Sequence, residues 1–467
     1  MIFKEGKFLI FVTVLFVSLS IFLFVREPMV SAKVELKSSV VGIKALDGKA
    51  LPVFSEDRDF IYSPDSFTVK LGDIYLPITI RPYESFLSQA VYELFSFSVY
   101  SIFIFNTALG IFLIFLAYRF GSITAFLVAL SLPYISSLID KNSYYVGSIL
   151  VVASLFKDSK DFRSYIPFVL IIAILLNAKL GLSIFFSIFI SSILQKSEFK
   201  SVLKSILFTI FGLIPYLISY ISINSRYSAS NFLLAPPSFE FFRLPDFPEV
   251  PTLITILVLS VAYILSLRSN ELRSLSIFAI VFVCSQFLLE FVFYYNDAFK
   301  FFPSFLLSIF LLGGMTSYYR KVLYVPIIGL FLIFHIYKML YWKPEAGYYS
   351  YRSVKELSDY LVENGVRNPS VLSDVPLGFV SSGKLRPIYW HQIWDFVKKK
   401  EKNIYVDLRE FSPLLLKMNS GRYLVIDATE DEYNEINMAR IKSGIDMRRI
   451  KEIVEQNRLI FIIAYIM

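Results

Sequence analysis

The segment Phe8–Val25, FLIFVTVLFVSLSIFLFV, runs for 18 residues without a charged side chain. That length is close to the roughly 20 apolar residues that an α-helix needs to cross a bilayer. A second long apolar run, Val322–Trp342, which contains one charged residue, Lys338, begins more than three hundred residues further along. The chain as a whole is 56% hydrophobic with a mean hydropathy of +0.60. These features exclude an ordinary soluble protein and indicate a polytopic membrane protein.

Apolar runs bounded by charged residues predict about eleven transmembrane helices. Lysine and arginine are concentrated in alternate loops, and this bias places the N-terminus in the cytoplasm. The predicted spans are 8–25, 97–118, 120–139, 143–156, 165–176, 178–194, 204–223, 252–267, 274–295, 300–317 and 322–341.

The first apolar run also has features of a cleavable signal peptide. Lys4 and Lys7 precede it, and Val30-Ser31-Ala32 is a small-residue segment typical of a cleavage site. The run is long for a signal peptide, so we favour a retained anchor. With either interpretation, residue 33 onward lies outside the cytoplasm.

The span pattern divides the chain into two predicted domains. Residues 1–342 form a transmembrane domain with outer loops at 26–96 and 224–251, and residues 343–467 form an extracytoplasmic α/β domain. In the second domain, helical patterns at 354–364 and 430–442 alternate with β-type runs. Those runs are 370–372, 404–406, 423–426 and 459–464.

Composition excludes several kinds of site. The single cysteine, Cys284, precludes an intrachain disulfide and a cysteine zinc site, and two histidines make a histidine-based metal site or triad improbable. The net charge of +8 comes mainly from the membrane part. The positive-inside rule explains this charge, so no nucleic-acid partner is expected.

Charged residues near span ends on the predicted outer side are the candidate site. A charge close to hydrocarbon is costly unless a partner or ligand compensates it. A carboxylate can accept a proton from an acceptor hydroxyl, while lysine and arginine stabilise negative charge on a phosphate leaving group. The outer face therefore suits an amphiphilic substrate that carries phosphate. The main clusters are Glu56-Asp57-Arg58-Asp59, Asp73, Arg81, Asp140-Lys141, Lys179 and Lys300.

Several of these segments resemble motifs of the C-type (GT-C) membrane glycosyltransferases, in particular the aminoarabinose-transferase and protein O-mannosyltransferase-like group. Gly72-Asp73-Ile74-Tyr75-Leu76-Pro77 followed by Arg81-Pro82 is similar to the family segment "GDW-x-x-P … K/R-P". Glu56-Asp57-Arg58-Asp59-Phe60 lies where the family has an acidic D-E-x-x-Y motif, with the two acids in the opposite order.

The resemblance continues into the spans. Asp140 matches the position of the second outer-loop acid of the family. Leu175 to Gly181 is similar to an "L-L-T-K-G" segment, with Asn177 at the threonine position. Lys300 to Leu307 resembles the "K/R-x-x-x-Y-x-L-P" span that faces the lipid phosphate.

The resemblance implies a GT-C-like helical membrane fold and a transferase that uses a polyprenyl-phosphate-linked sugar donor. Glu56 or Asp57 would be the catalytic base, with Asp140 as a supporting acid. The expected substrate-binding residues are Arg58, Asp59, Asp73, Arg81, Lys179 and Lys300. No cofactor is implied, although carboxylates alone can hold a divalent metal. The expected location is the plasma or inner membrane.

Other interpretations stay open at this point. A non-catalytic membrane scaffold or partner subunit would keep the architecture without the chemistry, whereas a transporter would place its charged residues within the membrane. Individual residues also have structural explanations. Asp73 could cap a turn, Arg81 could contact lipid headgroups, and Lys179 could extend its ammonium toward water. The sugar, the acceptor and the oligomeric state are not encoded in these patterns.

Overall fold

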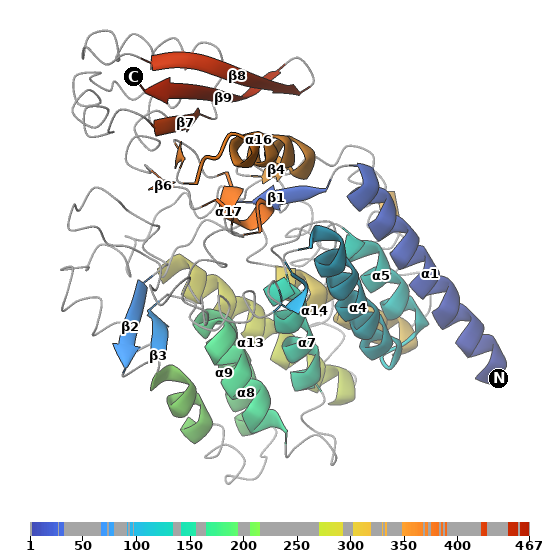
Figure 1. Ribbon diagram of the computed structural model, residues 1–467. Helices are drawn as coiled ribbons and strands as arrows, with labels where there is room; N and C mark the ends of the chain where they lie inside the picture. Colours follow the sequence, from blue (N-terminus) through green and yellow to red (C-terminus); the bar gives the residue numbers. More distant parts are fainter. Residues whose placement is uncertain are drawn as a thin grey trace, which may run out of the picture. The chain divides into compact units, whose positions relative to one another are not determined.

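The computed structural model (Figure 1) describes the chain in segments. These segments are residues 2–26, 28–31, 67–71, 74–78, 91, 94–96, 98–133, 142–155, 165–194, 206–214, 270–292, 302–318, 329, 332–333, 348–367, 369–371, 375–382, 384–385, 388–389, 422–426, 447–455 and 458–466. They fall into two compact units. The first comprises residues 1–26, 78–87 and 99–345, and the second comprises residues 27–77, 88–98 and 346–467.

The first unit is predominantly helical in its described part. Residues 206–214 are also helical. The named helices are α1 (Ile2–Arg26), α4 (Val99–Tyr118), α5 (Ser122–Ser131), α7 (Asn142–Leu155), α8 (Ile166–Leu176), α9 (Ala178–Leu194), α13 (Asn270–Val292) and α14 (Phe302–Tyr318).

These helices lie where the apolar runs predict them. Within the described residues, two are long and apolar enough to cross a membrane by themselves, Gly6–Arg26 and Val99–Tyr118. Six further apolar helices are shorter. The predicted span 252–267 lies outside the described residues, as does most of 322–341. The count of eleven spans therefore stays a prediction.

Helices α1 and α4 pack together in antiparallel directions. The ring of Phe24 stacks on that of Phe103 with centroids 4.1 Å apart. Nearer the other end of the pair, Phe16 lies against Gly110, where an added Cβ would overlap its ring. Between these two contacts, at the same level, lie the fully buried Ser20 and Asn106. Among the described residues, neither side chain has a hydrogen-bond partner.

Helix α14 is the most deeply enclosed helix of the described part. Every residue from Phe302 to Leu312 is buried, so no face of that segment is left for lipid or water. Helices α5, α7 and α13 pack around it. A helix that is apolar and covered all round is typical of a bundle core.

The second unit joins segments that are distant in the sequence. Strand β1 (Met29–Ser31), just after α1, pairs antiparallel with β4 (Tyr348–Ser350). The Tyr351 N–H donates to the Pro28 carbonyl at 2.9 Å and extends this pairing by one hydrogen bond. In a separate pair, β2 (Phe67–Leu71) is hydrogen-bonded to β3 (Ile74–Ile78).

A mixed sheet dominates the C-terminal part of this unit. Its described strands follow the order β6-β5-β7-β9-β8, parallel from β6 through β5 to β7 and antiparallel from there on. The strands are β5 (Ser370–Val371), β6 (Ile388–Tyr389), β7 (Arg422–Ile426), β8 (Met447–Glu455) and β9 (Arg458–Ile466). The predicted strands at 370–372, 423–426 and 459–464 are confirmed, whereas 404–406 lies outside the described residues.

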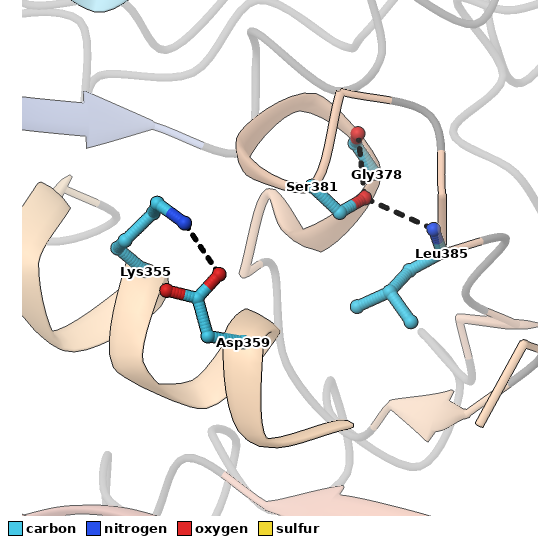
Figure 2. Close-up of polar contacts among 5 residues, drawn as sticks. All are labelled: Lys355, Asp359, Gly378, Ser381 and Leu385. Carbon is cyan, nitrogen blue, oxygen red and sulfur yellow. Dashed lines mark hydrogen bonds and ion pairs between the residues drawn. The ribbon is translucent and has the colours of Figure 1, made fainter. Parts of the chain in front are cut away.

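Helix α16 (Tyr351–Glu363) confirms the predicted helix at 354–364. Its apolar face is buried, and Lys355 forms an ion pair with Asp359 on the exposed side (Figure 2). The short helix α17 (Leu377–Val380) follows. Its end is closed by Ser381, whose Oγ donates to the Gly378 carbonyl and accepts from the Leu385 N–H, both at 3.0 Å (Figure 2). The predicted helix at 430–442 lies outside the described residues.

Candidate functional site

The junction between α8 and α9 is a one-residue break made by Asn177. Its backbone is extended, with φ −157° and ψ 113°, so α8 stops at Leu176 and α9 starts at Ala178. The Asn177 Oδ1 accepts hydrogen bonds from the N–H groups of Lys179 at 3.0 Å and Leu180 at 3.3 Å. Asparagine is among the preferred residues for capping a helix N-terminus. Asn177 therefore ends one helix and begins the next.

Close backbone packing holds this end of the unit together. A Cβ on Gly181 would lie 2.5 Å from both the Cα and the N of Ile174, so glycine is needed where α9 crosses α8. A Cβ on Gly147 of α7 would lie 2.9 Å from Leu180 Cδ2. Both Gly147 and Leu180 are near the beginning of their helices. The N-termini of α7 and α9 therefore lie at the same end of the bundle, beside the C-terminus of α8 (Figure 1).

Lys179 lies in the first turn of α9 and is partly exposed. Its carbonyl accepts the Ser183 Oγ hydroxyl at 2.8 Å, so its backbone is fixed in the helix. The helix macrodipole places partial positive charge at an N-terminus and disfavours a cation there by about 0.3–1 kcal/mol. Asn177 already occupies the N–H groups of Lys179 and Leu180. An anion at this end would therefore interact with the Lys179 ammonium and with the positive end of the helix dipole. The backbone N–H groups of Lys179 and Leu180 would not bind it.

Two polar residues that the sequence analysis did not select lie at the same end. Asn142, the first residue of α7, is fully buried. Tyr145, one turn later, donates its hydroxyl to the Leu132 carbonyl at 3.1 Å and so connects α7 to the end of α5. One sequence feature could have identified Asn142. It is a polar residue directly after Asp140-Lys141, at the beginning of an apolar run.

The other predicted site residues lie outside the described residues: Glu56, Asp57, Arg58, Asp59, Asp73, Arg81, Asp140 and Lys300. Their neighbours in the sequence are described in three cases. Asp73 falls in the two-residue connection between β2 and β3, Asp140 precedes α7 by two residues, and Lys300 precedes α14 by two residues. Of the predicted set, the structure places Lys179 and shows its surroundings.

Comparisons with known proteins give a clear result at the level of structure. No protein-family model matches the sequence, and no curated protein matches it either. Among solved structures, the chain is similar to ArnT from Cupriavidus metallidurans in the apo state, with a TM-score of 0.55 and 13% identity over 96% of this chain and 97% of the other. The structure of ArnT bound to undecaprenyl phosphate matches with a TM-score of 0.53 and 12% identity, over the same shares of each chain.

These likenesses extend over nearly the whole of both chains. The chain therefore has the fold of ArnT, an aminoarabinose transferase of the GT-C type, as the sequence motifs predicted. That fold is a helical membrane fold.

Proposed function

We propose that the protein is a membrane glycosyltransferase that transfers a sugar from a polyprenyl-phosphate-linked donor to an acceptor outside the cytoplasm. The observation that carries the proposal is the capped N-terminus of α9 with Lys179 in its first turn. In a fold of which one solved example is bound to undecaprenyl phosphate, a cation and a positive helix end together suit a lipid phosphate.

The proposed chemistry is a single displacement at the anomeric carbon. Glu56 or Asp57 takes the proton of the acceptor hydroxyl or amine, and the acceptor atom forms the new bond to that carbon. The bond from the carbon to the phosphate oxygen breaks, and polyprenyl phosphate leaves with the electron pair. Attack from the opposite side inverts the configuration of the sugar carbon. Asp140 supports the base in this scheme.

The remaining predicted residues bind the donor or support the residues that do. Arg81, Lys179 and Lys300 stabilise the charge that grows on the departing phosphate, as preorganised cations do in phosphate-releasing reactions. Arg58 and Asp59 order the acidic segment, and Asp73 supports the loop that carries Arg81. No metal is required in this scheme, and added chelator is expected to leave transfer unchanged.

The proposed setting is the plasma or inner membrane, crossed about eleven times. The N-terminus faces the cytoplasm, and residues 343–467 form an α/β domain on the outer side. The mixed sheet and α16 support an α/β organisation of this region.

The test is transfer from polyprenyl-phosphate sugars by the purified full-length chain in detergent. We expect Asp57→Asn or Glu56→Gln to abolish turnover while binding of undecaprenyl phosphate persists. Lys179→Ala should weaken that binding by about tenfold or more, since hydrogen bonds to charged groups contribute about 1.5–3 kcal/mol. Lys179→Arg should retain part of it. Lys355→Ala, which removes an exposed lysine of α16, is the matched control and should change neither measurement.

The exchanged order of Glu56 and Asp57, with Phe60 after them, favours one alternative, a non-catalytic membrane scaffold. In that case the parent chain would bind undecaprenyl phosphate but transfer no sugar, and the two carboxylate variants would be indistinguishable from it. Loss of transfer in either variant excludes the scaffold.

A further inference from the structure

A second glycine packs against Ile174 from outside the α8–α9 pair. It is Gly212, which is buried in the helix at 206–214. A Cβ on Gly212 would lie 3.1 Å from both the Cβ and the Cγ2 of Ile174. The Gly181 contact described above reaches the backbone N and Cα of the same residue. Ile174 is therefore in close contact with two glycines, one on α9 and one on helix 206–214, which touch different parts of it.

Helix 206–214 lies along α8. The ring centroids of Phe168 and Phe208 are 6.2 Å apart. The contact of Ile174 with Gly212 comes six residues later on α8 and four residues later on the other helix, so the two helices run in the same direction. The opposite side of helix 206–214 carries exposed apolar residues, namely Leu207, Ile210, Phe211 and Ile214. This helix therefore supports α8 from one side.

The contact at Ile174 continues into the first turn of α9. The Gly181 N–H donates to the Asn177 carbonyl at 2.9 Å, and the Asn177 side chain accepts from the Lys179 N–H at 3.0 Å. Residues 177–181 thus form one hydrogen-bonded turn with Lys179 at its centre. Because packed interiors transmit strain, a shift of Ile174 against the Gly181 backbone must also shift this turn.

We infer that Gly212 is a positioning residue, which holds Ile174 against α9 and so places the Lys179 ammonium. This inference rests on the proposed function, in which Lys179 binds the donor phosphate. Glycine suits the role, because a side chain at position 212 would force Ile174 to move, and overpacked sites respond with shifts of the backbone. An error of about 1 Å in the position of a binding group can reduce catalysis about a hundredfold.

The first measurement follows the surroundings of residue 179 and does not depend on the function. Cys284 is the chain's single cysteine, so Cys284→Ser combined with Lys179→Cys leaves one thiol for maleimide labelling. We expect Gly212→Ala to change the labelling rate several-fold. Adding Ile174→Val, which removes the Cδ1 that lies 3.3 Å from the added Cβ, should bring the rate back toward that of the parent. Volume-conserving exchanges are the best tolerated in a packed core.

The matched control makes the same change at another close contact of the same unit. Gly110→Ala adds a methyl group against Phe16 in the α1–α4 pair, so it should lower the thermal midpoint and leave the labelling rate unchanged. If Gly212→Ala does not fold, Ile174→Leu tests the same contact. It removes the Cγ2 that lies beside Gly212 without adding atoms, and the rate should again change.

The second measurement is the dissociation constant for undecaprenyl phosphate, with the full-length chain in detergent. Gly212→Ala should raise it about threefold to tenfold, and the added Ile174→Val should reverse most of this rise. In a Lys179→Ala background, Gly212→Ala should have no further effect. A role in stability alone predicts a different result, in which binding weakens in that background too and weakens in Gly110→Ala as the thermal midpoint falls.

The outcomes separate the two proposals. An unchanged labelling rate in Gly212→Ala overturns the positioning role even if the chain binds and transfers as proposed. An equal change of rate in Gly110→Ala overturns it as well, and so does a changed rate with an unchanged dissociation constant. If the rate changes in Gly212→Ala and returns with Ile174→Val, but the parent chain does not bind undecaprenyl phosphate, Gly212 still positions residue 179 and the proposed function fails.

Discussion

The helix pairs α8–α9 and α1–α4 both approach closely at a glycine, yet they treat their polar residues differently. In α9, Ser183, Ser187 and Ser191 each donate to the carbonyl four residues earlier, and Asn177 caps the helix. In α1–α4, Ser20 and Asn106 are fully buried and have no hydrogen-bond partner in the part of the chain that the structure describes. The three serines and Asn177 of the pair that carries Lys179 are thus hydrogen-bonded within that pair. In the other pair, burial of unpartnered polar side chains lowers the stability. From this difference we predict that the α8–α9 crossing is the more rigid of the two.

Alanine substitution at the two glycines tests this difference most directly. In Gly181→Ala the new Cβ meets the backbone of Ile174, which cannot rotate away, and Ile174 is also packed against Gly212. We expect a loss of about 3 kcal/mol of stability. In Gly110→Ala the new Cβ meets the outer end of the Phe16 side chain, which can shift more easily than backbone, so the loss should be about 1 kcal/mol.

The thermal midpoints of the two purified variants in the same detergent measure this difference. Equal midpoints would contradict the view that the α8–α9 crossing is the more rigid of the two.

The next largest effect should come from the unpartnered amide. Asn106→Leu removes the two polar atoms that have no partner and replaces them with an apolar group of similar length. We expect the variant to be more stable by about 1 kcal/mol, because a buried unsatisfied group costs roughly 1–3 kcal/mol. The measurement is the thermal midpoint together with transfer activity. A less stable or inactive variant would show that the Asn106 amide contributes to stability or activity. The proposed difference between the two helix pairs would then not hold.

The smallest effects concern the cap of α9. Asn177→Ala should cost about 1 kcal/mol through loss of the N-cap, whereas Asn177→Asp should keep the stability of the parent. The aspartate variant also places a negative charge two residues from Lys179, so its affinity for undecaprenyl phosphate should fall several-fold while its thermal midpoint holds. If both variants bind the lipid like the parent, the N-terminus of α9 is not at the phosphate.

The helices were predictable because burial in a bundle and burial in lipid both demand long apolar runs. The break at Asn177 was predictable for the same reason, since Lys179 interrupts one such run. Strand β8, Met447–Glu455, was not predicted, because its sequence MRRIKEIVE contains too many charged residues to show alternation. It is an edge strand of the described sheet, where charged side chains are tolerated and discourage further pairing.

The candidate site was predictable in part. Lys179 was found because a charge within an apolar stretch is conspicuous. The cap that orients it was seen as a departure from the family motif, although asparagine and threonine can both cap a helix. The contact between Ile174 and Gly212 joins residues from two helices, and only the packing of helix 206–214 on α8 reveals it. The spacing of two residues along the sequence does not predict such a contact between helices.

The pairing of β1 with β4 has a consequence for biosynthesis. Met29 can pair with Ser350 only after that residue, more than three hundred residues later in the chain, has been synthesised. At about 5–20 residues per second, synthesis of that stretch takes on the order of 15 to 60 seconds. Throughout that interval the nascent protein has an unpaired strand directly after its first helix in the sequence. Translocation machinery or a holding chaperone would have to protect this strand until the partner emerges.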